Sequence, residues 1–201
     1  MLDVEGFILV GGASSRMGAD KALLRLGGRT FVERAGAALT GVAASTRIVS
    51  SRPEHARLGL PVVEDVFRGA GALGGIHAAL RACRAPWAAV VSCDLPFATG
   101  ELLAHLASLR EAGVEAVAPR QEDGRPQPLC AFYAREVCLT VAERMLRGDE
   151  RRPRALLAEV RTRWVEFAEL SGLTGAENFF LNVNTPHDLA RARDIIEARA
   201  E

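Results

Sequence analysis

Hydrophobic and polar positions follow two periods along the chain. Short apolar runs rich in β-branched residues predict strands, and the windows between them, with apolar positions three and four residues apart, predict helices. The predicted strands are GFILV (6–10), TRIVS (46–50), PVVE (61–64), WAAVVS (87–92), EAVAP (115–119), PLCAFY (128–133) and RWVEF (163–167). The predicted helices cover residues 30–39, 73–82, 99–111 and 136–147. This alternation predicts an α/β fold, a three-layer sandwich around a mainly parallel sheet.

Capping residues mark where two of the helices begin. Thr30 and Glu33 have the spacing of a capping box. Near the end of the chain, Thr185 stands at an N-cap, Pro186 at the first helical position and Asp188 at the third, which predicts a final helix from residue 186 to about residue 200. Two long polar segments, 120–127 and 148–154, are expected to be loops. No repeat or linker divides the chain, so residues 1–201 are predicted to form one domain.

Charge and composition narrow the function classes. Lysine plus arginine and aspartate plus glutamate both number 25, so the chain has no overall basic field that would attract nucleic acid or an anionic membrane. No apolar run approaches the roughly 20 residues that span a bilayer, and the first residues lack the features of a signal peptide. We expect a cytoplasmic protein with no nucleic-acid or membrane partner. The four cysteines form no metal-ligand or redox spacing and are expected to be core thiols.

A glycine-rich segment, LVGGASSRMGADKALL (9–24), follows the first predicted strand. A loop there lies at the carboxyl edge of a parallel sheet, where ligands of open α/β folds bind. Gly11 and Gly12 leave backbone N–H groups free to face an anion, Ser14 adds a hydroxyl, and Arg16 and Lys21 add charge-assisted donors. This chemistry suits a polyphosphate. The spacing matches neither the P-loop nor the GxGxxG motif, and a flexible turn with solvated cations is the alternative.

An aspartate ends the fourth predicted strand. In WAAVVSCDLPF, Asp94 follows the buried run and Pro96 stops the strand two residues later. Asp94 is therefore expected at the same sheet edge as the glycine-rich segment. A carboxylate beside a phosphate cradle is the usual means of holding Mg²⁺. The alternative is that Asp94 braces the turn before Thr99.

These segments carry a family resemblance. The pattern G-G-x-S-x-R-M-G-x-D-K-x-L-L resembles the signature of nucleotidyltransferases, and is most similar to that of the molybdenum cofactor guanylyltransferases. GAGALGGIHAAL, CDLPF, GRPQPLCAFY and NVNTPHDL also fit that family. The resemblance implies a Rossmann-like nucleotidyltransferase fold, GTP and molybdopterin as substrates, Mg²⁺ as cofactor and molybdopterin guanine dinucleotide and pyrophosphate as products. It also leaves room for transient contact with other molybdenum cofactor proteins.

The resemblance carries site roles onto this chain by position. It implies a purine platform, triphosphate contacts, further nucleotide contacts, a metal ligand and an acceptor side. Leu9, Val10 and Gly11 would form the purine platform, and Arg16 and Lys21 would contact the triphosphate, with Gly12 and Ser14 of the same segment beside them. Ser51 and Asp65 would be further nucleotide contacts, and Asp94 would be the metal ligand. Gln127, Asn182 and Asn184 would lie on the acceptor side. Ser51 stands where the family often has an asparagine. Similar cytidylyltransferases usually have two alanines and then a glycine at the end of the strand, so the glycine pair Gly11–Gly12 implies room for guanine.

Several candidates keep a plainer interpretation. Gln127 could belong to a surface loop entering an edge strand, and Asn182 and Asn184, which share one face because they alternate with Val183, could tie the backbone to the final helix. The arginines of the loop 148–154 could form a cationic lid or simply be solvated. The four histidines are expected on helix surfaces or edges; they are His55, His77, His105 and His187.

The expected chemistry is phosphoryl transfer by positioning and electrostatics. An acceptor phosphate is already anionic at neutral pH, so a general base is not needed. The alternatives are a cytidylyltransferase acting on molybdopterin or another phosphorylated metabolite, and a nucleotide-binding accessory protein without catalysis.

Overall fold

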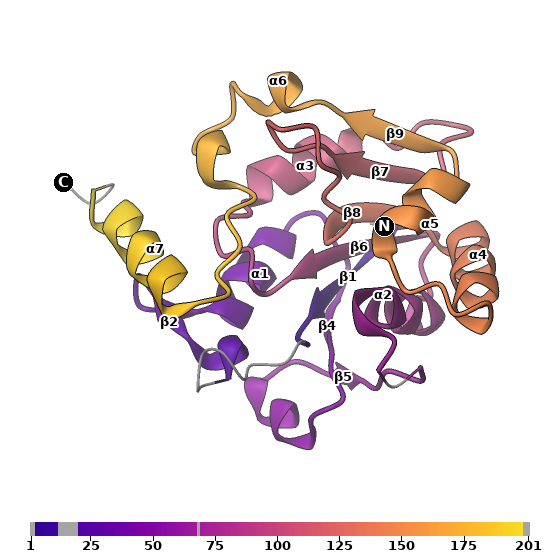
Figure 1. Ribbon diagram of the computed structural model, residues 1–201, viewed down its shortest axis with the longest axis horizontal. Helices are drawn as coiled ribbons and strands as arrows, with labels where there is room; N and C mark the ends of the chain where they lie inside the picture. The colour runs from indigo at the N-terminus through magenta and orange to yellow at the C-terminus, as the bar shows by residue number, and fades with distance from the viewer. Residues whose placement is uncertain (1–2, 12–19, 68, 199–201) are drawn as a thin grey trace.

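A seven-stranded sheet forms the centre of the protein (Figure 1). The computed structural model describes residues 3–11, 20–67 and 69–198. Six of the seven strands share one direction, and β8 runs antiparallel to both of its neighbours, β6 and β7. The strands, in their order across the sheet, are β5 (Val62–Val63), β4 (Thr46–Val49), β1 (Val4–Leu9), β6 (Trp87–Ser92), β8 (Cys130–Ala134), β7 (Ala116–Pro119) and β9 (Thr162–Val165). The predicted fold class, a sandwich with a mainly parallel sheet, is confirmed.

Helices cover both faces of the sheet, as Figure 1 shows. The helices are α1 (Phe31–Leu39) and α3 (Gly100–Ser108) on one face, and α2 (Gly71–Ala82), α4 (Arg135–Arg147) and α5 (Pro153–Glu159) on the other. Side chains along β1 divide between the two resulting cores: Val4 and Ile8 pack with α1 and α3, and Phe7 and Leu9 with α2. This follows from the two-residue period of a strand buried on both faces.

The remaining elements complete the chain around the carboxyl edge of the sheet. They are η2 (Lys21–Leu23), the hairpin β2 (Arg25–Leu26) and β3 (Arg29–Thr30), η3 (Pro53–Leu58), α6 (Phe167–Leu170), η4 (Ala176–Asn178) and α7 (Pro186–Ala198). After β9 the chain returns toward the centre, where the backbone N–H of Val183 donates to the carbonyl oxygen of Asp94 at 2.9 Å. The last segment therefore reaches the edge at which β1 and β6 end.

The predicted helix starts are confirmed at both capping sites. Thr30 Oγ1 accepts from the backbone N–H of Glu33 at 3.1 Å, and the Glu33 carboxylate accepts from that of Thr30 at 2.6 Å. Thr185 and Asp188 exchange the same two bonds at the start of α7, at 3.2 and 2.8 Å. The two pairs hold helix N-termini that would otherwise leave donors without partners.

Several predicted boundaries are wrong: the helix predicted over 99–111 ends at Ser108 and the strand predicted from residue 128 begins at Cys130. In two further places the sequence analysis missed a short helix. The loop predicted over 148–154 ends early, because Pro153 takes the first position of α5, where its missing N–H costs nothing. The last predicted strand stops at Val165, and Phe167 instead begins α6, whose cap is a Glu166–Glu169 capping box. Both helices are too short for the hydrophobic period to stand out from the flanking polar residues.

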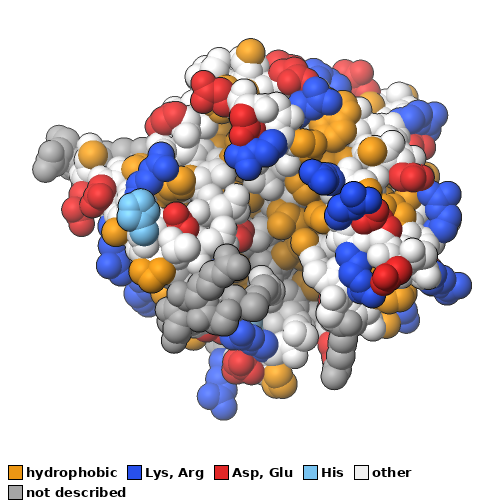
Figure 2. Space-filling view, in the orientation of Figure 1, with side chains coloured by type: hydrophobic (Ala, Val, Ile, Leu, Met, Phe, Trp, Pro, Cys, Tyr) orange, Lys and Arg blue, Asp and Glu red, His pale blue; other side chains and the backbone are white. Residues whose placement is uncertain are grey.

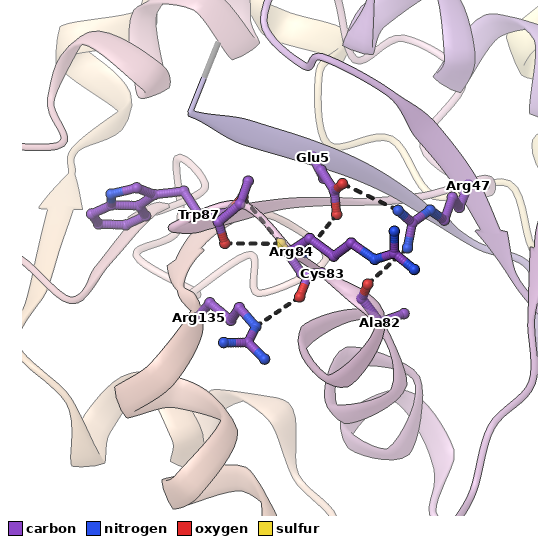
Figure 3. Close-up of polar contacts among 8 residues, drawn as sticks. Glu5, Arg47, Ala82, Cys83, Arg84, Trp87 and Arg135 are labelled. Atoms are coloured by element: carbon purple, nitrogen blue, oxygen red, sulfur yellow. Dashed lines mark hydrogen bonds and ion pairs between the residues drawn. The ribbon is translucent and has the colours of Figure 1, made fainter. Parts of the chain in front are cut away.

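The amino edge of the sheet is held by a network of polar contacts (Figure 3). Arg47 on β4 donates to Glu5 of β1 at 3.1 Å and to the carbonyl of Ala82 at 2.7 Å, and the side chain of Arg135 donates to the carbonyl of Cys83 at 2.7 Å. Two arginines thus satisfy carbonyls at the C-terminus of α2, where positive charge is favoured. This edge lies opposite the one that carries the predicted site.

Surface charge and buried thiols agree with the sequence. Figure 2 shows acidic and basic side chains interspersed over one face of the molecule. All four cysteines are buried free thiols, as predicted; burial raises the pKa of Cys130 to about 12. Within the part of the chain that the structure describes, no helix is both long enough and apolar enough to cross a membrane.

Candidate functional site

A cavity of about 510 Å³ opens at the carboxyl ends of β1 and β4. β1 is the strand at which chain order across the sheet reverses, since β4 lies on one side of it and β6 on the other. Such reversal points are where open α/β sheets bind ligands. The structure brings five of the residues assigned to the nucleotide to this cavity: Leu9, Val10, Gly11, Ser51 and Asp65. The first turn of α2 forms the facing wall.

Gly11 leaves open space inside this cavity. A Cβ atom added to Gly11 would meet no atom within 4 Å, so packing between the described residues does not require a glycine there. Gly74 differs, because a Cβ atom there would lie 2.9 Å from a carboxylate oxygen of Asp65. The glycine in α2 therefore lets Asp65 approach the helix, whereas Gly11 lines the cavity with open space around it. Gly12, Ser14 and Arg16, which the sequence assigns to the triphosphate, lie outside the described residues.

Asp65 presents a partly buried carboxylate to the cavity. Its Oδ1 accepts from the backbone N–H of Phe67 at 2.9 Å, which fixes the side chain. Burial raises the pKa of Asp65, and the hydrogen bond from Phe67 offsets only part of that effect. The folded protein thus holds this carboxylate in a position where its charge is disfavoured unless a ligand donates to it.

Lys21, Asn184 and Asp94 come together beside the cavity. The Nζ atom of Lys21 donates to Oδ1 of Asn184 at 2.6 Å. The backbone bond from Val183 to Asp94 ties the segment that carries Asn184 to the end of β6. Burial is the main cause of the raised pKa of the Cys93 thiol. The charges of Asp94 and Asp20 raise this pKa further, and the charge of Lys21 lowers it. Lys21 and Cys93 line one small pocket, so Lys21 lies near the strand end that carries Asp94.

The side chain of Asp94 fits a metal ligand. Its Oδ1 atom is shielded from solvent and has no hydrogen-bond partner among the described residues. The alternative role, bracing the turn before α3, is not supported for this atom, because Thr99 caps α3 through its own hydroxyl. A buried carboxylate oxygen without a partner is costly unless something else satisfies it. A hard divalent cation such as Mg²⁺ would do so.

The described residues contain no group of three or more histidine, cysteine, aspartate or glutamate side chains placed to hold a metal. A cation at Asp94 would therefore take most of its ligands from water and from phosphate oxygens. This is the usual coordination of Mg²⁺, which keeps several waters and binds through one or two carboxylates plus substrate phosphates.

Sequence reasoning missed a hydrogen-bonded network next to Lys21, formed by the partly buried Asp20 and the buried His55 and Ser50. His55 joins Asp20 to Ser50 through its two ring nitrogens, each at 2.6 Å. The expectation that the histidines lie on helix surfaces or edges is wrong for His55 and for His77, which are both only 2% exposed. His77 points into the core from α2, where its ring meets Phe67 edge-on at 4.8 Å. Asp20 lies in the quoted motif, but nothing in the sequence around His55 signals its burial.

The candidates for the acceptor side separate into different surroundings. Asn182 and Asn184 are both exposed and flank the buried Val183. Asn182 lines a second cavity, of about 550 Å³, between residues 121–125 and 176–182, whereas Asn184 contacts Lys21. Gln127 is 6% exposed, and the strand that follows it, β8, lies inside the sheet, so the edge-strand interpretation is wrong.

The arginines proposed as a cationic lid have other partners. Arg151 pairs with Asp149 and Arg152 with Glu150, and Arg154 lies within α5. These pairs are exposed, and exposed ion pairs contribute little. The contacts favour the solvated interpretation.

Comparison with known proteins places the chain in a family. Residues 6–164 match the model of the MobA-like NTP transferase domain. A probable molybdenum cofactor guanylyltransferase of Pelotomaculum thermopropionicum is 40% identical over 200 residues, with 98% of this chain and 95% of the relative covered. The molybdenum cofactor guanylyltransferase of Desulfosudis oleivorans is 32% identical over 197 residues, with 97% and 96% covered.

Solved structures agree with the sequence relatives. The crystal structure of molybdopterin-guanine dinucleotide biosynthesis protein A from Archaeoglobus fulgidus matches with a TM-score of 0.80 and 29% identity, and the match covers 96% of this chain and 99% of that one. The match extends past residue 164 and so includes the segment that carries Asn184. The chain belongs to the MobA-like NTP transferase family and is a nucleotidyltransferase.

Proposed function

We propose that this enzyme transfers GMP from GTP to the terminal phosphate of molybdopterin, giving molybdopterin guanine dinucleotide and pyrophosphate. The relatives named as molybdenum cofactor guanylyltransferases support this choice of substrates. The observation that carries it is the contact between Lys21 and Asn184 next to a cavity of about 510 Å³ at the ends of β1 and β4, with which the small pocket lined by Lys21 shares Val10, Gly11 and Arg52. Membership in a nucleotidyltransferase family favours an enzyme over an accessory binding protein.

The cavity suits guanine better than cytosine. Leu9 and Val10 supply an apolar end of β1 and Gly11 leaves room for the larger base. Asp65 offers a carboxylate, which can only accept. Guanine carries adjacent N–H donors at N1 and N2, whereas cytosine places an acceptor, N3, beside its amino group. A carboxylate facing the base would therefore reward guanine and repel cytosine. Ser51 provides a hydroxyl near the base, reaching it directly or through water.

The reaction needs positioning more than covalent help from the protein. An oxygen of the acceptor phosphate attacks the α-phosphorus of GTP in line, a new P–O bond forms, and the bond to the β-phosphate oxygen breaks with its electrons on departing pyrophosphate. Lys21 has three N–H donors, one of which goes to Asn184. The other two would hold the triphosphate and stabilise the charge that develops on the leaving group. Gly12, Ser14 and Arg16 are proposed to share this role.

Asp94 would hold Mg²⁺ through Oδ1, which has no partner among the described residues. Bound there, the cation would supply charge neutralisation between the α-phosphate and the acceptor phosphate. On the acceptor side, Asn184 would orient Lys21, and the amides of Gln127 and Asn182 would donate to the pterin. Gln127 is nearly buried and so offers a fixed donor, while Asn182 opens to the second cavity.

Two measurements test the proposal. Calorimetric titration of the enzyme with GTP and with CTP in the presence of Mg²⁺ should show tighter binding of GTP. Pyrophosphate release with molybdopterin as acceptor should then depend on GTP. Turnover with CTP alone would move the enzyme to cytidylyl transfer, and no pyrophosphate from either nucleotide with molybdopterin would overturn the proposed acceptor.

A further inference from the structure

We propose that His55 is a positioning residue that holds Lys21 in place through Asp20. This inference rests on the proposed role of Lys21 in nucleotidyl transfer. It concerns the hydrogen-bonded network Asp20–His55–Ser50, which links the glycine-rich motif to the end of β4. None of its three members was assigned a function from the sequence.

Asp20 fixes the backbone that carries Lys21. It is the N-cap of η2, whose first residue is Lys21, and its Oδ1 accepts from the backbone N–H of Ala22 at 3.0 Å. Ala22 is fully buried, so this turn is anchored in the core. A shift of the Asp20 carboxylate would therefore move the turn from which the Lys21 side chain extends.

His55 fixes Asp20 from the other side. Its Nε2 lies 2.6 Å from Oδ2 of Asp20, and because a carboxylate can only accept, Nε2 carries the proton. Its Nδ1 lies 2.6 Å from Oγ of Ser50. Ser50 Oγ also accepts from the backbone N–H of Arg52 at 3.0 Å, which leaves the hydroxyl proton for Nδ1. With these hydrogen-bond directions, every polar side-chain atom of Asp20, His55 and Ser50 has a partner.

Burial makes these contacts rigid. His55 is 2% exposed and Ser50 is 5% exposed, so water competes little for their hydrogen bonds. Burial raises the pKa of Asp20, but the hydrogen bonds from His55 and Ala22, together with nearby positive charge, outweigh it, and the net shift is downward. Asp20 therefore remains an ionised acceptor at neutral pH.

The network Asp20–His55–Ser50 connects Lys21 to the nucleotide cavity. Ser50 and Arg52 line that cavity, and a small pocket contiguous with it is lined by Asp20, Lys21 and His55. Lys21 is consequently held at both ends, its backbone by Asp20 and its ammonium by Asn184. A cation placed before the reaction begins costs less ordering in the transition state than one that must be recruited.

The order of the contacts argues against a hydrolytic triad. In such a triad the serine contacts Nε2 and the aspartate Nδ1, whereas here the two are exchanged. Ser50 is also engaged by the N–H of Arg52 and almost fully buried. The network Asp20–His55–Ser50 is therefore suited to holding Lys21 in position and not to nucleophilic attack.

Two amide variants of His55 separate the contacts. In His55→Gln the amide nitrogen can reach the place of Nε2 and donate to Asp20, whereas the shorter His55→Asn can reach only Ser50. We expect H55N to lower kcat by about 10- to 100-fold, as misplacement of a catalytic group by about an ångström does, with a smaller change in KM. H55Q should recover most of the loss. Glu54→Gln, an exposed substitution on the same η3 element, is the matched control.

A double-mutant cycle with Lys21→Ala decides whether His55 acts through Lys21. We expect H55N to cost little once Lys21 is absent. An equal cost in both backgrounds, or equal activity of H55N and H55Q, would overturn the inference; melting temperatures check that the variants fold. The same cycle measured on GTP binding by calorimetry needs no acceptor. It therefore tests the coupling even if molybdopterin proves to be the wrong acceptor.

Discussion

The Nζ atom of Lys21 lies 2.6 Å from Oδ1 of Asn184, across 163 positions of the chain. The matched family domain ends at residue 164, so one partner of this contact comes from beyond it. The backbone N–H of Val183, next to Asn184, donates a hydrogen bond to the carbonyl oxygen of Asp94. The segment after β9 thus completes the site that β1 and β6 begin, because its Asn184 holds the ammonium of Lys21.

Substitution of Asn184 should show what this contact does. Asn184→Ala removes the acceptor that orients Lys21, and we expect kcat to fall by about 10-fold, the value of one hydrogen bond to a charged group. Asn184→Asp should cost more, because a carboxylate would pair with the ammonium and compete with the triphosphate. Pyrophosphate release measures both. Equal turnover of N184D and the parent enzyme would contradict the role of Asn184, and the exposed Arg191→Ala on α7 is the control.

Substitution of Asp94 should lower activity without lowering stability. Asp94→Asn keeps the shape but removes the charge that would bind Mg²⁺, and we expect turnover to fall on the order of 10³-fold, because metal stabilisation is worth several kcal/mol. Oδ1 of Asp94 has no partner among the described residues, so the melting temperature should stay the same or rise. Calorimetric titration of Mg²⁺ in the presence of GTP should show weakened binding. A D94N enzyme that binds Mg²⁺ as tightly as the parent protein and turns over at the parent rate at limiting Mg²⁺ would refute the assignment.

The sequence predicted those features that depend on neighbouring residues. The run WAAVVS matches the bounds of β6, and Thr30 and Glu33 form the expected capping box, because strand period and capping are local properties. Leu9, Gly11 and Asp65 meet in one cavity because the carboxyl ends of parallel strands share an edge.

Other features depend on how distant segments pack. Asn184 meets Lys21 only because the chain crosses the sheet edge after β9. His55 stands in a polar window, SRPEHARL, and its burial is decided by Asp20 and Ser50, one of them 35 positions away. The antiparallel insertion of β8 between β6 and β7 is likewise a property of the assembled sheet. The local pattern of a single sequence gives no information about such long-range contacts.

The amino edge of the sheet should contribute stability without affecting turnover. Arg47→Met removes the bonds from Arg47 to Glu5 and to the carbonyl of Ala82, and we expect the free energy of unfolding to fall by about 2 kcal/mol, since both bonds involve a charged donor. Arg84→Ala is the control, because Arg84 contacts Glu5 through its backbone N–H, which the substitution keeps (Figure 3). Urea unfolding compares the two. A loss of stability in R84A equal to that in R47M would contradict the assignment to the guanidinium.

Asp65 should trade stability for nucleotide choice. Because burial raises its pKa above the ordinary value of 3.8, the folded state disfavours its charged form. The stability linked to its protonation is fully present below pH 3.8 and is lost as pH rises through the higher folded pKa. Asp65→Asn, which keeps an oxygen for the N–H of Phe67, should therefore be more stable than the parent protein at neutral pH. The difference should shrink toward zero as the pH falls below 3.8.

The same variant should lose its preference for guanine. An asparagine can accept only one of the two guanine N–H groups and can donate to N3 of cytosine, so we expect GTP to bind about 10-fold more weakly and CTP to gain. Thermal unfolding across pH measures the first effect, and paired GTP and CTP titrations measure the second. If D65N gains stability at neutral pH but keeps the full GTP preference, the carboxylate is buried as described but does not contact the base. Base selection would then have to come from Ser51 and the backbone at the end of β1.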